Sequence, residues 1–349
     1  MNNEQLQDWL TTIADKFKQF EERTEPSKGA IQYQKKLAEI SPETSILINY
    51  LTNNYENIGL IQPIVAQLLS IYYKLGIGRA FVLQLVPSLI STYLLGIAKR
   101  QKLSIAMLET FFMAIYNEEI LAGGPGSQQM NKKVEEVRIP SVRYPSVYHD
   151  PSKLNPYQEI STLRLGGGAS VHNVVKIGPY PAVDKITAEN RPLVLSVIVR
   201  AVNNLLCRMS RNIVCHSYCL SFLILAKSGF NWPESDFRLK ILHDRASDDE
   251  YGDHSKKPRI PMSPFVLIEA LNGIHYALFN GYPDIALRAL DAIHHRAQFE
   301  FYADVMLVTN ALRSSLMDPD TIRMMLEIEP PVAKKPNSPM SPSNNHALK

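Results

Sequence analysis

The spacing of apolar side chains along the chain predicts a protein built mostly from helices. Residues 4–20 carry an apolar side chain every three or four positions with charged side chains between them, which is the pattern of an amphipathic helix. Residues 45–121 continue in apolar segments that are separated or kinked at Pro63, Gly76 and Pro87. No strict period of about 34 or 40 residues relates these segments, so we expect an irregular helical array and not a regular solenoid.

The most regular stretch lies at residues 258–316. Ser263 and Pro264 are typical of a helix start, because serine caps the first turn and proline at the first position loses no hydrogen bond. Gly281 and Pro283 then predict the end of this helix and the start of another. Small or compact side chains recur on one stripe of the first helix: Ala270, Gly273, Ile274 and Ala277. Such a stripe indicates a buried helix that a neighbouring helix approaches closely.

Residues 132–182 interrupt the helical pattern. Prolines punctuate this segment, and two short runs at 133–140 and 172–179 are rich in β-branched residues. We expect these runs to pair as a small antiparallel hairpin, with edge strands only, because proline lies at the end of each run. The predicted fold class is therefore mainly α: an irregular, α-solenoid-like helical bundle with a small β-hairpin insertion near residues 132–182.

The pattern predicts one helical domain over residues 1–328. Its N-terminal helices occupy residues 4–121 and its C-terminal helices residues 192–316, with the proline-rich hairpin segment between them. Residues 329–349 are rich in proline, serine and asparagine, and we expect this tail to be disordered.

One apolar stretch allows a second interpretation. Residues 80–98 carry no charge, and nineteen residues just reach the lower limit of a membrane-spanning helix. Pro87 and several polar residues dilute the stretch, so we favour a buried pair of core helices over a transmembrane helix.

Composition narrows the function classes. The 349 residues are 45% hydrophobic and 20% charged, as in an ordinary folded protein. The net charge of +3 arises from 37 basic and 34 acidic residues without a long basic run, which argues against a nucleic-acid-binding protein. The N-terminus has no secretory pattern and the three cysteines are an odd number, so a reducing cytosolic setting fits best.

Tyr148, His149 and Asp150 are the residues that most resemble acid–base machinery. Adjacent residues in an extended segment point in opposite directions, so they do not form a proton relay by themselves. We therefore expect no catalytic site and no enzyme activity. The alternative is a small hydrolase or transferase that uses this Tyr148/His149/Asp150 site.

Histidine and cysteine pairs do not have metal-site spacing. His294 and His295 are neighbours on a predicted helix and diverge by about 100°, so they do not chelate one ion. Cys207, Cys215 and Cys219 lack the tight spacing of a four-ligand zinc site. We expect buried thiols, no metal and no cofactor.

Short motifs in residues 258–316 carry a resemblance to a known family. In order, they are Arg259-Ile260-Pro261, Phe279-Asn280-Gly281, Ala289-Leu290-Asp291 and Arg296-Ala297-Gln298. This stretch resembles the core of the hyccin family. Two further matches are Asp8-Trp9-Leu10 near the N-terminus and the run from Pro145 to Pro151.

The resemblance implies a function that the residue pattern alone does not name. Hyccins are non-catalytic accessory subunits of the plasma-membrane phosphatidylinositol 4-kinase complex, which makes phosphatidylinositol 4-phosphate. They pack against a tetratricopeptide-repeat scaffold subunit, which joins the type III alpha phosphatidylinositol 4-kinase, while a palmitoylated protein anchors the assembly. The resemblance therefore implies a cytosolic protein that reaches the cytoplasmic face of the plasma membrane as a peripheral subunit.

Two segments are the predicted partner interface. The first is the helix at residues 4–20, which either docks on its own domain or is offered to a partner's groove; a membrane-surface helix is the weakest alternative, because its polar face is not enriched in cations. The second is the tyrosine-rich turn at residues 144–150, because irregular segments often carry contacts. The predicted interface residues are Trp9, Leu10, Ile13 and Phe17 in the first segment, and Tyr144, Tyr148 and His149 in the second.

Overall fold

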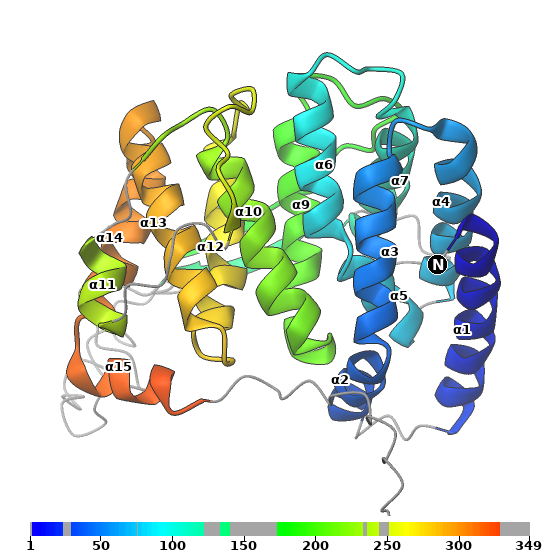
Figure 1. The fold of residues 1–349 in the computed structure, drawn as a ribbon, viewed down its shortest axis with the longest axis horizontal. Coiled ribbons are helices and arrows are strands. Elements are labelled where there is room, and N and C mark those ends of the chain that lie inside the picture. The colour runs from blue at the N-terminus through cyan, green and yellow to red at the C-terminus, as the bar shows by residue number, and fades with distance from the viewer. Residues whose placement is uncertain are drawn as a thin grey trace, which may run out of the picture.

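The computed structural model of the chain is a helical array. It describes residues 2–23, 29–74, 76–121, 133–139, 173–232, 236–243 and 251–328. Figure 1 shows α1 at one end of the long axis and α11, α13, α14 and α15 at the other. This confirms the predicted fold class, an irregular helical array with a small strand insertion.

The N-terminal half of the array consists of packed helices with short connections. Its helices are α1 (Asn3–Arg23), α2 (Gly29–Glu39), α3 (Ser41–Asn54), α4 (Ile58–Tyr73), α5 (Gly76–Leu83), α6 (Val86–Ala98) and α7 (Ala106–Glu119). Asn57 begins α4 by accepting a hydrogen bond from the Leu60 backbone N–H through its side chain. The apolar stretch Gly76–Ala98 is long and apolar enough to cross a membrane, yet it is 83% buried inside the protein. It is split into α5 and α6, which fits the predicted buried helix pair.

The C-terminal half carries the remaining helices. They are α9 (Arg191–Asn203), η3 (Leu206–Arg208), η4 (Asn212–Ser217), α10 (Tyr218–Lys227), α11 (Asp236–Leu242), α12 (Pro264–Leu278), α13 (Pro283–Glu300), α14 (Ala303–Ser315) and α15 (Pro319–Leu326). Pro264 and Pro283 occupy first-turn positions, as predicted. Ser263 precedes α12, but its side chain makes no capping hydrogen bond, so that part of the prediction is wrong.

Helix α11 is not among the helices that the sequence pattern singled out. Phe237 and Ile241 on one face of α11 are buried, and Arg238 forms an ion pair with Asp284 of α13. Tertiary contacts therefore order a segment whose local pattern is weak.

The predicted hairpin is present. Strands β1 (Glu135–Ile139) and β2 (Asn173–Ile177) pair antiparallel with Val137 opposite Val175. The half-exposed side chains of Val134 and Val175 agree with edge strands outside the main core.

Candidate functional site

The close approach of α10 to α12 lies at the centre of the array. A Cβ on Gly273 of α12 would lie 2.2 Å from the Tyr218 ring of α10, so only glycine leaves room for this ring. The predicted stripe of small residues on α12 thus has the packing role expected of it. Tyr218 and Ala270 are completely buried at this contact.

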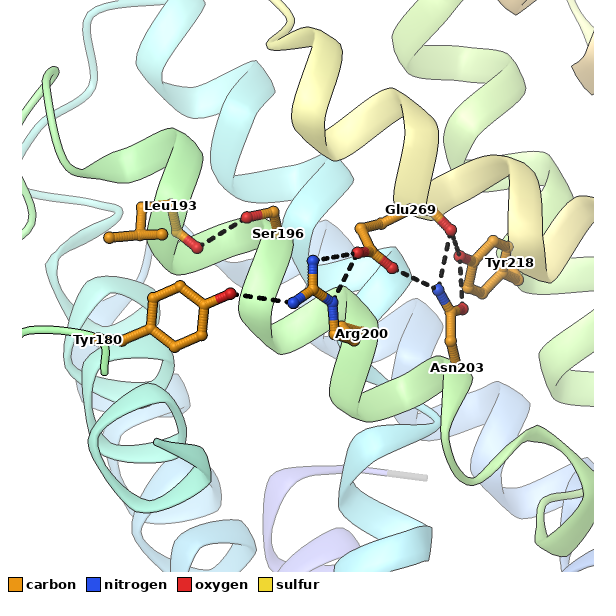
Figure 2. A network of polar contacts seen from close by, with 7 residues as sticks. All are labelled: Tyr180, Leu193, Ser196, Arg200, Asn203, Tyr218 and Glu269. Atoms are coloured by element: carbon orange, nitrogen blue, oxygen red, sulfur yellow. Dashed lines mark hydrogen bonds and ion pairs between the residues drawn. The ribbon is translucent and has the colours of Figure 1, made fainter. Parts of the chain in front are cut away.

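An ion pair joins α9 to α12 beside this contact (Figure 2). Arg200 of α9 donates from Nε to Glu269 Oε1 at 2.7 Å, and its Nη2 lies 2.6 Å from the same oxygen. Arg200 Nη1 also donates to the Tyr180 hydroxyl at 3.0 Å. The Glu269 side chain is 11% exposed, so the carboxylate is held mostly away from water. This arrangement is a charge-assisted contact that fixes one helix against another.

Asn203 and Tyr218 complete the network in Figure 2. Asn203 Nδ2 donates to the Glu269 backbone oxygen at 2.9 Å and to Glu269 Oε2 at 3.3 Å. Tyr218 donates its hydroxyl toward Asn203 Oδ1 at 3.1 Å and the Glu269 backbone oxygen at 3.3 Å. Each polar group of the network thus has a partner inside it.

The electrostatics of this network favour fixed protonation states. Burial would lower the pKa of Arg200, but its hydrogen bond and ion pair with Glu269 outweigh this effect and raise it. Burial, together with the charges of nearby groups, raises the pKa of Tyr218 well above its ordinary value. A paired guanidinium and a neutral phenol do not supply a general base or a nucleophile at neutral pH. The network is therefore a structural contact.

A pocket of about 400 Å³ opens beside the network. Its apolar wall includes Leu193, Phe265 and Ile268, and Arg200 and Glu269 line it while paired with each other. Phe265, which lines this pocket, is 65% exposed. The pocket is suited to an apolar side chain and not to bond-breaking chemistry.

The predicted interface residues of α1 lie mostly inside the protein. Leu10, Ile13 and Phe17 are buried against α4 and α5, and Trp9 is half-buried with its ring 6.0 Å from that of Phe81. This is the alternative in which the helix docks on its own domain. In this arrangement the three buried side chains are not available to a partner.

The second predicted interface segment lies outside the described residues. This applies to Tyr144, Tyr148 and His149, and also to Asp150 of the alternative enzyme site. Both remain predictions from the sequence.

The cysteine and histidine groups are engaged in packing. Cys215 and Cys219 are buried, and burial raises the pKa of Cys215 to about 12, which keeps it a thiol. Cys207 is exposed. His294 contacts Thr309 of α14 across 2.8 Å, from Nδ1 to Oγ1. Within the described ranges, no group of three or more His, Cys, Asp or Glu side chains is placed to hold a metal ion.

Exposed apolar side chains gather on the last helices of the array. They are Phe299, Phe301, Leu307, Met317, Met324 and Leu326. Helix α14 buries only Val305 and Thr309 completely, whereas Leu307 is 72% exposed. The exposed stripe around Leu307 also holds the small residues Ala303 and Ala311. We define the outer face of α14 as Ala303, Leu307, Asn310, Ala311 and Ser314, and it is the candidate interaction surface of this chain.

The sequence did not single out this surface. One signal was present, because residues 303–312 have apolar or small side chains on every side of the helix. Such a helix either packs against other elements on two faces or leaves one apolar face exposed to solvent. Among the described residues, the buried positions of α14 lie on one side of the helix and Ala303, Leu307 and Ala311 are exposed on the other.

A comparison with protein families gives one match. The family model described as Hyccin matches residues 30–336 of this chain. The matched span includes the polar network, the α10–α12 contact and the outer face of α14.

Proposed function

The chain belongs to the hyccin family, and from this membership we propose that it is an accessory subunit of a phosphatidylinositol 4-kinase complex. The family is non-catalytic, which fits a protein that is not an enzyme. In this proposal the kinase subunit makes phosphatidylinositol 4-phosphate, and this chain supports that synthesis by stabilising the assembly.

The proposed direct partner is a tetratricopeptide-repeat scaffold subunit. Through that scaffold, the chain joins the type III alpha phosphatidylinositol 4-kinase and a palmitoylated membrane anchor. Its proposed place is the cytosol and the cytoplasmic face of the plasma membrane, as a peripheral protein.

The observation that carries the proposal, besides the family match, is the uncovered outer face of α14. A helical array needs polar outer faces on the helices at its two ends if those ends are to lie in water. The outer face of α14 instead presents Leu307 between small residues, so a helix of another array can pack closely on it. We therefore propose this face as the contact with the scaffold.

Binding to the folded scaffold stabilises it by mass action. When the free chain exceeds its dissociation constant 100-fold, the scaffold gains about 2.7 kcal/mol of unfolding free energy. The test is the melting temperature of the purified scaffold subunit with and without this chain. The proposal expects a rise that depends on chain concentration, together with co-purification of the two proteins.

A matched pair of variants locates the contact. Leu307→Glu places a charge on the outer face of α14, whereas Leu103→Glu makes the same change at a leucine that is 81% exposed elsewhere. The proposal expects Leu307→Glu to abolish the rise in scaffold melting temperature and Leu103→Glu to leave it intact. Failure of the unmodified chain to bind the scaffold overturns the proposed function. Equal binding by both variants overturns only the location.

A further inference from the structure

A basic segment lies against the C-terminal end of α10. It contains Lys256, Lys257 and Arg259, and Lys227 occupies the last turn of the helix. Burial lowers the pKa of Lys257, and the charge of Lys99 from the end of α6 lowers it further. Lys99 and Lys257, from two separate parts of the chain, are therefore close enough to repel each other.

Arg259 is the most ordered exposed cation of this region. Its guanidinium carbon lies 4.4 Å from the ring centroid of Phe230 and 4.9 Å from that of Phe299. Trp232 stacks on Phe230 at 4.4 Å with an interplanar angle of 18°, which braces the ring. Such contacts hold a guanidinium in place without using its N–H donors.

The backbone on either side of Arg259 is also fixed. Gly229 has a φ of +80°, and a Cβ there would lie 2.8 Å from the Arg259 Cα, so glycine allows the two segments to touch. The Gly229 N–H donates to the His254 oxygen at 3.1 Å. Arg296 donates from Nη2 to the Ile260 oxygen at 2.6 Å. Two of the sequence motifs, Arg259-Ile260-Pro261 and Arg296-Ala297-Gln298, thus meet in space.

The donors of Arg259 are unused within the described part of the chain. Its guanidinium has neither a hydrogen bond nor an ion pair there, although it is held between two rings. Behind it, Arg296 is completely buried with its guanidinium carbon 4.6 Å from the Phe230 ring centroid. Arg296 Nη2 lies 2.8 Å from Glu300 Oε1, but its buried Nε and Nη1 have no acceptor among the described residues. The site therefore carries more positive charge and more donors than its described surroundings satisfy.

We propose that the Arg259 clamp, meaning Arg259 with Phe230 and Phe299, binds a carboxylate side chain in an acidic segment of a partner protein. A guanidinium presents parallel N–H donors that match the two oxygens of a carboxylate. The rings hold the guanidinium in advance, so binding orders little that is not already ordered. The surrounding lysines attract an acidic segment over a longer range.

The geometry of the Arg259 clamp favours a carboxylate side chain over an anionic membrane surface as the ligand. A membrane attracts any cation near it, so charge alone matters there and the shape of the cation does not. A carboxylate held by a fork of donors depends on the shape, which arginine has and lysine lacks. The clamp shares no residue with the outer face of α14, so the inference does not depend on the proposed scaffold contact.

The test uses the full chain with a labelled oligoglutamate peptide and an oligoglutamine peptide of the same length. Arg259→Lys keeps the charge and removes the fork, and the proposal expects binding of the oligoglutamate peptide to weaken about tenfold, the loss of roughly one charge-assisted hydrogen bond. Lys256→Gln, which removes one charge outside the clamp, is expected to weaken binding less. Phe299→Ala leaves every charge in place and removes one of the two rings that hold the guanidinium, so it serves as a second variant if Arg259→Lys fails to fold.

Three results overturn the proposal. One is equal affinity of the unmodified chain for the two peptides, and another is equal affinity of Arg259→Lys and the unmodified chain for oligoglutamate. The third is that the unmodified chain and Arg259→Lys both bind phosphatidylserine vesicles while neither binds oligoglutamate. That result would mean that the cations bind a membrane surface. Weaker binding of oligoglutamate by both Arg259→Lys and Phe299→Ala supports it.

Discussion

Helices α1 and α14 lie toward opposite ends of the array (Figure 1), and their outer faces differ in chemistry. Helix α1 buries Leu10, Ile13 and Phe17, and it exposes Glu4, Asp8, Asp15, Lys16 and Lys18. Helix α14 buries Val305 and Thr309 and exposes Leu307 with small neighbours. The outward face of α1 is charged, whereas that of α14 exposes one large apolar side chain, Leu307, among small and polar ones.

This difference shows where a partner is expected. A terminal helix whose outer face is polar completes an array in water, and α1 meets this condition. An apolar outer face costs free energy in water until another surface covers it. Under the proposed function, the end with the exposed Leu307 is therefore the end at which we expect the partner to bind.

The largest effect is expected at α1. Phe17→Ala removes a buried ring that lies 5.5 Å from the Phe81 ring, and we expect it to lower the free energy of unfolding by about 3–5 kcal/mol. Denaturant unfolding of the two proteins measures this loss. A loss near zero would mean that α1 is not part of the folded core, and the two ends would no longer differ as described.

A smaller loss is expected midway between the ends. Gly273→Ala places a methyl group against the Tyr218 ring, and the forced shift should cost about 1–3 kcal/mol. Gly59→Ala is the control, because its new Cβ meets only Asn57 Oδ1 at 3.6 Å. Thermal unfolding should separate the two variants. Equal stability of both would contradict the close contact of α10 with α12.

The next largest loss of unfolding free energy is expected at Thr309, on the buried face of α14. His294 Nδ1 and Thr309 Oγ1 form a buried hydrogen bond of 2.8 Å. Thr309→Val leaves His294 Nδ1 without this partner and should cost about 1–2 kcal/mol. Thr110→Val is the matched control, because Thr110 is exposed and donates only within its own helix. Unchanged stability of Thr309→Val would show that α14 is not anchored through this contact.

The same histidine predicts a pH dependence. Burial, with the charges of Arg313 and His295, lowers the pKa of His294 to about 4 from an ordinary value of 6.5. Below about pH 6.5 His294 is therefore protonated in the unfolded state but still neutral in the folded state. The free energy of unfolding consequently falls as the pH drops from 6.5 toward 4. One such proton changes the unfolding free energy by up to about 1.4 kcal/mol per pH unit. His294→Gln should reduce the slope measured between pH 6.5 and 5, and an unchanged slope would be inconsistent with a buried neutral His294.

The smallest effect is expected at the outer face of α14. Leu307→Ala removes a side chain that is 72% exposed, so the unfolding free energy of the isolated chain should change by less than about 0.5 kcal/mol. Denaturant unfolding of this variant and of Phe17→Ala, measured together, compares the loss of unfolding free energy at α14 with that at α1. Similar losses at Leu307 and Phe17 would remove the distinction between the two ends.

Local pattern predicted much of the fold. The stripe at residues 4–20, the small residues around Gly273, and the prolines at 264 and 283 each act within one or two helical turns, so the sequence shows them directly. The same holds for the hairpin, whose two runs have strand composition. Helix α11 escaped prediction because its order depends on contacts with α13, such as that between Arg238 and Asp284.

The functional surfaces were harder to predict. Periodicity shows which side chains of α1 share a face, but it does not show whether the cover comes from this chain or from a partner. For this reason the sequence left open whether Leu10, Ile13 and Phe17 pack on their own domain or on a partner, and in the structure they are buried against α4 and α5. The pairing of Arg200 with Glu269 joins residues 69 apart in the chain, a separation that no local pattern encodes.

Hydrogen–deuterium exchange of the chain, alone and bound to the tetratricopeptide-repeat scaffold, tests most directly which end meets the partner. The account predicts slower exchange in α14 on binding and unchanged exchange in α1. Slower exchange confined to α1, with α14 unchanged, would contradict it.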